Sequence, residues 1–283
     1  MDQKLPTAAD HARLGLITGQ WRDWQPRPAR QPEVVSRLAG FSNDNYLVAA
    51  DEHRFVVRLN NDSYELGVDR LLERQILTDI AGAEFAPRLA WWSEHSLVTG
   101  YIPAPHPADP EPQLLGELFR QIHGTAVSPH PPLDPYEHLE NYFHQLDSVP
   151  ANIAAGYEAL LATRPTPSGD LCLCHHDLLL GNVLAGDGSA IVIDWEYARL
   201  GDPAFDIAIV AHTYGYDDSA VAELLRAYGG GADLQERIRH YRGLYSLVEI
   251  CWWLLRGQDA ASLTAMIDNA LAQIRRRPGT SVS

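Results

Sequence analysis

The hydrophobic pattern of this chain changes at a run of prolines, and this change limits the folds that the chain can adopt. Five prolines lie within ten positions, at 103, 105, 107, 110 and 112. They stiffen the backbone and remove donors that a helix or a sheet needs. Before them the pattern is mainly that of strands, and after them it is mainly that of helices. We therefore expect two lobes, residues 1–102 and residues 103–283.

The first lobe is expected to be an antiparallel sheet with one helix. Short runs rich in Val, Leu, Tyr and Phe, separated by turn-forming clusters, predict strands at Glu33–Leu38, Asn45–Ala49, Arg54–Leu59, Pro87–Trp92 and Ser96–Ile102. Apolar residues at helical spacing predict one helix over Ser63–Ile80.

The second lobe is expected to be mostly helical. Helical spacing predicts helices at Gln113–His123, Tyr136–Gln145, Ile153–Ala162, Phe205–Thr213, Ser219–Tyr228, Leu234–Leu255 and Ala260–Arg276. Short strand-like segments lie between them at Leu171–Cys174 and Ala190–Ile193, with Asn182–Leu184 as a further candidate. A small β-rich lobe joined to a larger helical lobe predicts an α+β protein with its ligand site in the cleft between the lobes.

Composition excludes several classes of protein. The 22 Lys and Arg against 37 Asp and Glu give a formal charge of -15, which is the wrong sign for binding nucleic acid or an anionic membrane. No apolar run approaches the ~20 residues of a membrane span, and the first thirty residues lack a signal peptide's apolar core, so we expect a cytoplasmic protein. Lys4 is the one lysine, which excludes a Walker-type phosphate loop and Schiff-base chemistry.

Residues 171–198, LCLCHHDLLLGNVLAGDGSAIVIDWEYA, carry the side chains that point to chemistry. Asp177 and Asn182 are five apart in an expected loop, and Asp194 follows the second strand. We expect a pair of strands to bring these three residues together, where their oxygens would suit Mg²⁺. In phosphoryl transfer, one Asp accepts the proton of the attacking hydroxyl while an Asn and a second Asp hold the metal.

The sequence His175-x-Asp177-x-x-x-x-Asn182, followed by Asp194 and Glu196 in IDWEYARLGDPAFDIA, resembles the kinase-like phosphotransferases of the aminoglycoside phosphotransferase and choline kinase superfamily. It is most similar to choline/ethanolamine and thiamine kinases. The resemblance implies a two-lobed protein-kinase-like fold and an ATP- and Mg²⁺-dependent transfer of phosphate to an alcohol. It implies Asp177 as catalytic base, Asn182 and Asp194 as magnesium ligands, and Glu196 as an acidic neighbour of substrate or metal.

The resemblance extends to the first lobe, where it implies a nucleotide site. The turn containing Ser42 and Asn43 would fold over the phosphates, and Arg58 would replace the usual phosphate-binding lysine. An arginine binds phosphate oxygens through a rigid fork, so the replacement is chemically sensible. The partner of Arg58 would be Glu73, with Glu65 as a second candidate, and the backbone of Val98–Ile102, including Gly100 and Ile102, would bind adenine.

The acceptor has to be inferred from the helical lobe. On the helix around residues 241–255, Tyr241, Tyr245 and Trp252 share a face with Glu249 at its margin, while Trp253 points away. An aromatic stripe with one carboxylate suits a quaternary ammonium, as in the choline kinases, so choline is the first expected acceptor. Thiamine or an aminoglycoside would also suit an acidic protein, and the same stripe is compatible with simple core packing.

Other interpretations stay open at this point. Zinc ligation is one reading of Cys172, Cys174, His175 and His176, whereas free thiols in an apolar strand more simply pack in the core. We expect His175 to pack the catalytic loop and Asp202 or Asp206 to cap the helix near Phe205. A degenerate relative that binds nucleotide without transferring phosphate would share the fold, although the intact Asp177, Asn182 and Asp194 argue against it.

Overall fold

A computed structural model describes residues 7–38, 43–61, 67–166, 169, 171–186 and 189–275. The chain divides into two compact units: residues 1–106 with 183–196, and residues 107–182 with 197–283. The sequence analysis had placed everything after residue 102 in the second lobe. Residues 183–196 join the first unit because the Ala185 N–H donates to the Pro105 carbonyl (2.9 Å) and the Val192 N–H to the Phe85 carbonyl (2.8 Å).

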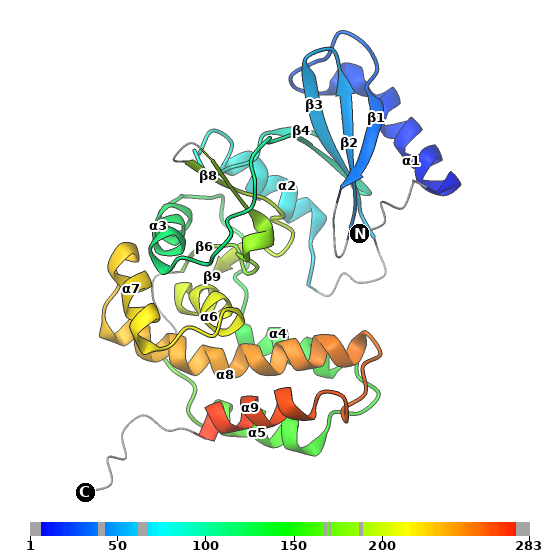
Figure 1. Cartoon of the computed structure of the whole chain (residues 1–283). Coiled ribbons are helices and arrows are strands. Elements are labelled where there is room, and N and C mark those ends of the chain that lie inside the picture. The colour runs from blue at the N-terminus through cyan, green and yellow to red at the C-terminus, as the bar shows by residue number, and fades with distance from the viewer. Residues whose placement is uncertain are drawn as a thin grey trace, which may run out of the picture. The chain divides into compact units, whose positions relative to one another are not determined.

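The first unit contains the antiparallel sheet that the sequence predicts (Figure 1). Its strand order is β1-β2-β3-β5-β4, and every neighbouring pair is antiparallel. In the register of the central strands, Arg58 lies opposite Asn45 on one side and Leu97 on the other. The strands are β1 (Glu33–Leu38), β2 (Asp44–Ala50), β3 (His53–Leu59), β4 (Leu89–Ser93) and β5 (Ser96–Gly100).

An N-terminal helix, α1 (Ala8–Gly19), covers part of this sheet and was not predicted. Thr7 and Asp10 form a capping box at its start, in which each side chain accepts a hydrogen bond from the other's backbone N–H. Leu14 and Ile17 of α1 join a buried cluster with Trp24 and with Tyr46, Val48, Phe55, Val57, Leu59, Ala90 and Val98 from the sheet. The first helix is therefore held by the sheet's core.

The second helix, α2 (Arg70–Asp79), begins later than the predicted Ser63. Gly67 has a φ of 82°, and Asp69 caps the helix by accepting from the N–H groups of Leu71 and Leu72, both at 3.0 Å. Residues 62–66, which include Glu65, lie outside the described residues. The late start places Arg70 and Glu73 in the first turn, both buried.

The second unit is built around one long helix, α8 (Ala232–Leu255), which packs against α4, α5, α6, α7 and α9 (Figure 1). This surrounding explains why most residues of its segment 243–251 are apolar and buried. The other helices are α3 (Pro112–His123), α4 (Pro135–Phe143), α5 (Ala151–Leu161), α6 (Pro203–Thr213), α7 (Asp218–Tyr228) and α9 (Thr264–Arg275). Six of the seven predicted helices begin and end within two residues of the predicted bounds, and α9 begins four residues later than predicted.

The short strands pair differently from the expectation. β6 (Cys172–Cys174) pairs with β9 (Arg199–Gly201), which was not predicted, and β7 (Val183–Gly186) pairs with β8 (Ser189–Val192). The strands before and after the catalytic loop are therefore not partners. Because β7 and β8 are close in sequence, bringing them together costs little chain entropy. The three residues of β9 are too few to show a strand pattern in the sequence.

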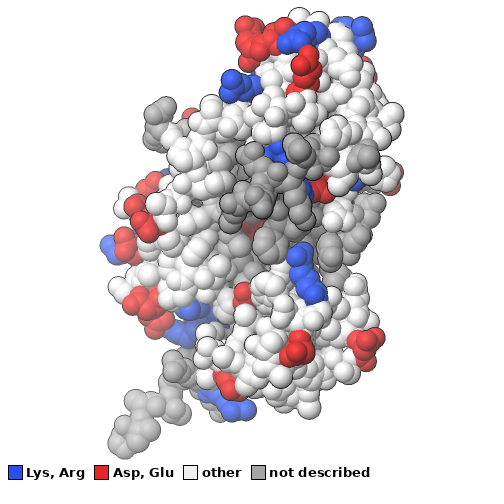
Figure 2. Space-filling model, turned by 45° about the vertical axis from the view of Figure 1, so that its right-hand side comes forward, with Lys and Arg blue, Asp and Glu red and all other residues white. Residues whose placement is uncertain are grey.

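Charged side chains of both signs are spread over the surface. On the face shown in Figure 2, the described Asp and Glu side chains occur in small separate groups, and no broad basic area is visible. Among the described residues, no helix is both long and apolar enough to cross a membrane.

Packing of α3 on α7 gives a first prediction. A Cβ added at Gly116 would lie 2.4 Å from the Leu224 carbonyl oxygen and 2.9 Å from the Ala227 Cβ, so the two helices must separate. We expect Gly116→Ala to lower the free energy of unfolding by about 1–3 kcal/mol. Gly15 in α1 has no such neighbour within 4 Å, and Gly15→Ala should be neutral or stabilising by up to about 1 kcal/mol. Urea denaturation compares the two; equal effects would contradict the packing argument.

Candidate active site

Arg58, in β3, is the centre of a buried network in the first unit. It is 6% exposed. Its Nη2 donates to Glu73 at 2.6 Å, its Nη1 to Asp194 at 3.1 Å and its Nε to the Asn60 side-chain oxygen at 3.0 Å. These bonds use the guanidinium as a planar fork, which a lysine cannot reproduce. The ion pair predicted between Arg58 and Glu73 is present.

A second arginine, which the sequence analysis did not single out, shares the network. Arg70 donates from Nη1 to Glu73 at 3.1 Å and to Glu196 at 2.9 Å. The side-chain amide of Asn43 also donates to Glu196 at 2.8 Å, and its oxygen accepts from the Asn61 N–H. Glu196 and Asn43 are therefore buried partners of this network.

The sequence held one signal for Arg70, its spacing of three residues from Glu73 on a helix. Its contact with Glu196 joins residues 126 positions apart, which no local pattern reveals. Ser42, the other residue expected over the phosphates, lies outside the described residues.

Three carboxylates in this network share two guanidinium groups. Burial would raise the pKa of Glu73, but the charges of Arg58 and Arg70 outweigh it and hold that pKa below its usual range. Burial, followed by the charge of Glu196, raises the pKa of Asp194 to about 7 although Arg58 opposes this rise. Asp194 is therefore the least compensated carboxylate, and a cation beside it would be favourable.

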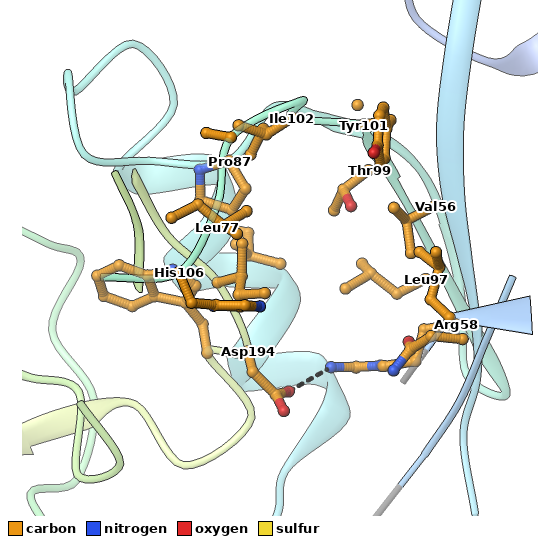
Figure 3. A pocket seen from close by; sticks show the side chains of 17 residues that line it. Val56, Arg58, Leu77, Pro87, Leu97, Thr99, Tyr101, Ile102, His106 and Asp194 are labelled. Atoms are coloured by element: carbon orange, nitrogen blue, oxygen red, sulfur yellow. Dashed lines mark hydrogen bonds and ion pairs between the residues drawn. The ribbon is translucent and has the colours of Figure 1, made fainter. Parts of the chain in front are cut away.

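A pocket of about 300 Å³ opens beside this network, entirely within the first unit (Figure 3). The Arg58–Asp194 ion pair lies at one end, and Tyr101 and Ile102 lie at the opposite end. Apolar side chains line the space between, including Leu38, Val56, Leu77, Leu97, Leu184 and Ile193. A flat, mostly apolar ring with a charged tail would fit such a pocket.

The backbone of Gly100 and Ile102 is expected to bind adenine, and of these two only Ile102 has an N–H available as a donor among the described residues. The Gly100 N–H is already bonded to the Arg88 carbonyl at 2.9 Å, and the Tyr101 N–H to the Arg54 carbonyl at 3.0 Å. For the Ile102 N–H, no partner is found among the described residues. Ile102 is thus the better placed of the two to donate to a ligand.

The catalytic loop belongs to the second unit. Its half-buried Asp177 accepts two bonds from the Asn182 side-chain amide, one at the carbonyl (2.8 Å) and one at Oδ2 (2.9 Å). The Asp177 N–H donates to Nδ1 of His175, which is fully buried, so His175 packs the loop as expected. The Tyr214 hydroxyl accepts from the Leu180 N–H at 2.5 Å. The bond from Asn182 therefore orients the carboxylate of Asp177, and the bond to His175 holds its backbone.

Asp206 holds the start of this loop rather than capping a helix. Its carboxylate accepts from the N–H groups of His175 (2.8 Å) and His176 (2.7 Å) and lies 3.0 Å from Nε2 of His123. Burial opposes ionisation, but the bond from His123 outweighs it and lowers the pKa of Asp206 to about 2. Asp202 does cap α6, as expected, by accepting from the Ala204 N–H at 2.8 Å. The expected capping role therefore holds for Asp202 and fails for Asp206.

The aromatic face of α8 divides into buried and accessible parts. Tyr241 is buried, its ring packs on Phe205, and its hydroxyl donates to Asp202 at 3.2 Å, so it belongs to the core and not to the expected acceptor site. Tyr245 and Glu249 are half-buried. Burial and then the charges of Asp177 and Glu249 raise the pKa of Tyr245, which shows that these carboxylates share its surroundings.

The guanidinium group of Arg256, the residue after α8, lies against an aromatic ring of the helix. Its central carbon is 3.9 Å from the Trp252 ring centre, in cation–π contact. Trp253, which was expected to point well away, makes edge contact with Trp252 at 4.8 Å between ring centres. Glu249 is bonded to Nε2 of His212 at 2.9 Å. Large flat side chains on adjacent positions can meet at their edges although their Cβ atoms diverge.

The buried network generates a stability prediction. Removing Arg70 leaves the buried carboxylates of Glu73 and Glu196 and the half-buried carboxylate of Asp194 with one guanidinium, so Arg70→Met should lower the free energy of unfolding by about 3–5 kcal/mol. Arg74, one turn later on α2, is exposed and stacks on Trp92, and Arg74→Met should cost about 1 kcal/mol or less. Urea denaturation followed by circular dichroism measures both. Similar losses in the two variants would show that the network does not stabilise the unit.

The sequence is similar to a known protein family and to individual known proteins. The model of the phosphotransferase enzyme family matches residues 33–241. Protein LicA of Haemophilus influenzae is 25% identical over 211 residues, which are 68% of this chain and 62% of LicA. The thiamine kinase of Salmonella paratyphi A is 26% identical over 229 residues, 75% of each chain. The match therefore spans less than two thirds of LicA's own length.

Solved structures show the fold. Choline kinase LicA from Streptococcus pneumoniae superimposes with a TM-score of 0.75 at 19% identity, over 94% of this chain and 100% of that chain. A structure of LicA in complex with AMP gives 0.75 at 20% identity, over 95% and 99%. The mixed α/β fold, with its antiparallel sheet and helical part, is thus that of the protein-kinase-like phosphotransferases, as predicted. Because the family model covers most of its length, the chain belongs to the phosphotransferase enzyme family.

Proposed function

We propose that the chain transfers the γ-phosphate of ATP to the hydroxyl of a small cationic alcohol, most readily choline. The observation that carries this proposal is the ion pair of buried Arg58 with Asp194 at the end of an apolar pocket. An arginine fork and a metal-binding carboxylate are what a triphosphate tail requires. The adenine ring would lie at the other end, where the Ile102 N–H would donate to it. The AMP complex of LicA supports nucleotide use.

The residues expected to hold Mg²⁺ have suitable chemistry. Asp194 supplies a carboxylate whose pKa is raised by burial and then by the charge of Glu196, so a cation beside it would be favourable. In Asn182 the amide nitrogen is bonded to Asp177, which orients the side-chain oxygen as the remaining ligand atom. Oxygen donors of this kind are those that Mg²⁺ prefers. When bound, the ion would neutralise charge on the nucleotide phosphates.

Asp177 would act as the catalytic base. Its carboxylate accepts the proton of the acceptor hydroxyl as that oxygen attacks the γ-phosphorus. The Asn182 amide donates to the carboxylate, and the Asp177 backbone N–H donates to His175, so both the side chain and the backbone of Asp177 are held. Fixed orientation matters because positioning supplies most of the rate in phosphoryl transfer.

The acceptor site would lie around Tyr245 and Glu249. Burial and then the charges of Asp177 and Glu249 raise the pKa of Tyr245, and a cationic group bound beside Tyr245 would bring its own hydroxyl toward the base. Trp252 already holds the Arg256 guanidinium against its ring, which supports cation binding on this surface. Choline gains from ring faces and apolar contact, whereas the ammonium of ethanolamine is more strongly hydrated and should be a poorer substrate. Thiamine and aminoglycosides are the alternative acceptors.

Substitution of the carboxylates tests the chemistry. Asp177→Asn should lower kcat by about 10²–10⁴-fold because the proton acceptor is lost, and Asp194→Asn should lower it by orders of magnitude through weaker metal binding. Asp218→Asn is the control, since Asp218 is exposed on α7 and pairs only with surface Arg239 among the partners described here. Turnover is measured in excess ATP and Mg²⁺. Turnover within tenfold of wild type for Asp177→Asn would remove the assigned base.

A second prediction concerns the acceptor. Glu249→Gln should raise KM for choline by about tenfold, the kinetic equivalent of about 1.4 kcal/mol, and leave KM for ATP unchanged. Tyr241→Phe should change neither KM, because the Tyr241 hydroxyl is bonded to Asp202 within the core. Steady-state kinetics with choline, ethanolamine and thiamine gives the values. A kcat/KM for thiamine tenfold above that for choline would overturn the acceptor while retaining the phosphotransferase.

A further inference from the structure

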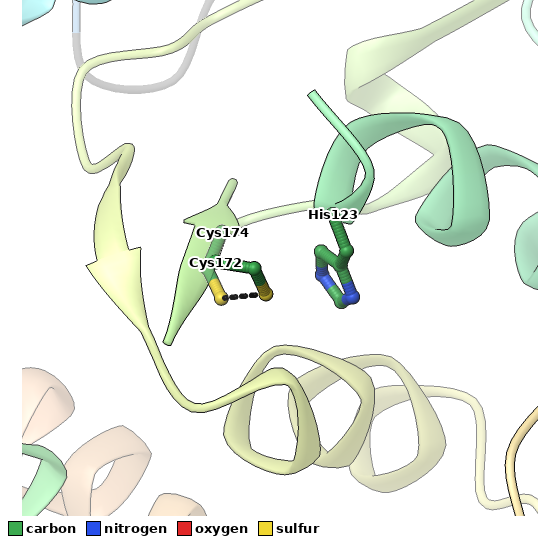
Figure 4. Close-up of side chains that lie close together, drawn as sticks. All are labelled: His123, Cys172 and Cys174. Atoms are coloured by element: carbon green, nitrogen blue, oxygen red, sulfur yellow. Dashed lines mark hydrogen bonds between the residues drawn. The ribbon is translucent and has the colours of Figure 1, made fainter. Parts of the chain in front are cut away.

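A cluster of two thiols and an imidazole lies beneath the catalytic loop in the second unit (Figure 4). It consists of His123, the last residue of α3, and Cys172 and Cys174 of β6. Among the described residues, these form the one group of three or more His, Cys, Asp or Glu whose ligand atoms all lie within 4.8 Å of one another. The phosphotransfer chemistry uses none of the three.

We propose that this cluster binds a thiophilic divalent cation of the Zn²⁺ class. The two sulfur atoms are 3.8 Å apart. A tetrahedral zinc with Zn–S bonds of about 2.3 Å separates two of its sulfur ligands by about 3.8 Å. Residues two apart on a strand share one face, so β6 presents both sulfurs together without further rearrangement.

The imidazole of His123 is supported as metal-binding histidines usually are. Its Nε2 lies 3.0 Å from the buried carboxylate of Asp206, which would fix the proton on that nitrogen and leave Nδ1 to bind the metal. The Tyr228 hydroxyl is 3.1 Å from Nδ1 and would turn aside. The other two histidines of the zinc reading do not join the group: the Asp177 N–H donates to His175 Nδ1, and neither His175 nor His176 places a ring nitrogen within 4.8 Å of all the ligand atoms of the cluster.

Charge and access agree with this assignment. Two thiolates neutralise a divalent cation, and their two protons leave when it binds. Cys174 is fully buried, whereas Cys172 is half-buried and provides the route of entry. Three protein ligands leave the fourth tetrahedral position to water or a small exogenous ligand.

The cluster is joined to the catalytic loop through two links. Cys174 directly precedes His175, and the carboxylate of Asp206 that contacts His123 also accepts from the His175 and His176 N–H groups. A bound metal would therefore fix β6, α3 and the start of the loop to one another. The role is distinct from phosphoryl transfer and does not depend on the identity of the acceptor.

Cobalt substitution tests the site. We expect untagged, reduced, metal-free full-length protein to bind one Co²⁺ in the presence of excess Mg²⁺, with sulfur-to-cobalt charge-transfer absorption and the intense d–d bands of a tetrahedral ion. Oxygen ligands at the phosphotransfer site cannot produce the charge-transfer band. Zn²⁺ should displace the cobalt and remove both signals.

Variants assign the ligands. Cys172→Ser should weaken Co²⁺ binding by at least about tenfold and reduce the charge-transfer band, and its half-buried position favours a folded variant, which circular dichroism checks. Cys251→Ser is the matched control, because Cys251 is a buried free thiol on α8 outside the cluster. Absence of the charge-transfer band in wild type, or a band of wild-type strength in folded Cys172→Ser, would overturn the proposal. Loss of the band in folded Cys251→Ser would overturn it too.

Discussion

The guanidinium of Arg58 ties together the parts of the first unit. It joins β3 to α2 through Glu73 and to the segment after β8 through Asp194, with Asn60 completing the fork. Burying such charges costs much of the energy that their attraction returns, so apolar residues would stabilise the unit at least as well. We therefore interpret the network as a device that positions Asp194 and a phosphate-binding cation beside the pocket.

Two residues beside these networks have strained backbone conformations. Asp194 has a φ of 63° and His176 a φ of 60°, values that side chains with a Cβ rarely adopt. Such conformations cost of order 1–3 kcal/mol each and persist where surrounding contacts enforce them. Around Asp194 the contact is Arg58, and around His176 it is Asp206, which accepts its N–H. In the first unit the ion pair with Arg58 holds Asp194. In the second unit the bond to Asp206 holds His176, the residue before Asp177.

Local patterns predicted most of the fold. Strand alternation and helical spacing gave the sheet and the seven helices of the second unit, because those signals depend on neighbours in sequence. Contacts between distant residues were not accessible: no local pattern predicts that Glu196 pairs with Arg70. Tyr241 and Tyr245 share a helix face in sequence and both rings contact Phe205 of α6, yet of the two only Tyr241 is buried. Asp206 followed a capping pattern, yet it accepts loop N–H groups from outside its helix.

The central claim is phosphoryl transfer from ATP to an alcohol. Its most direct test is mass spectrometry of the products formed from ATP that carries ¹⁸O at the three non-bridging oxygens of its γ-phosphate, with choline, ethanolamine and thiamine supplied together. The account predicts a phosphate ester, of choline before the others, that contains all three heavy oxygens because the alcohol oxygen attacks phosphorus. Labelled inorganic phosphate without any labelled ester, or ATP left unchanged, would contradict it.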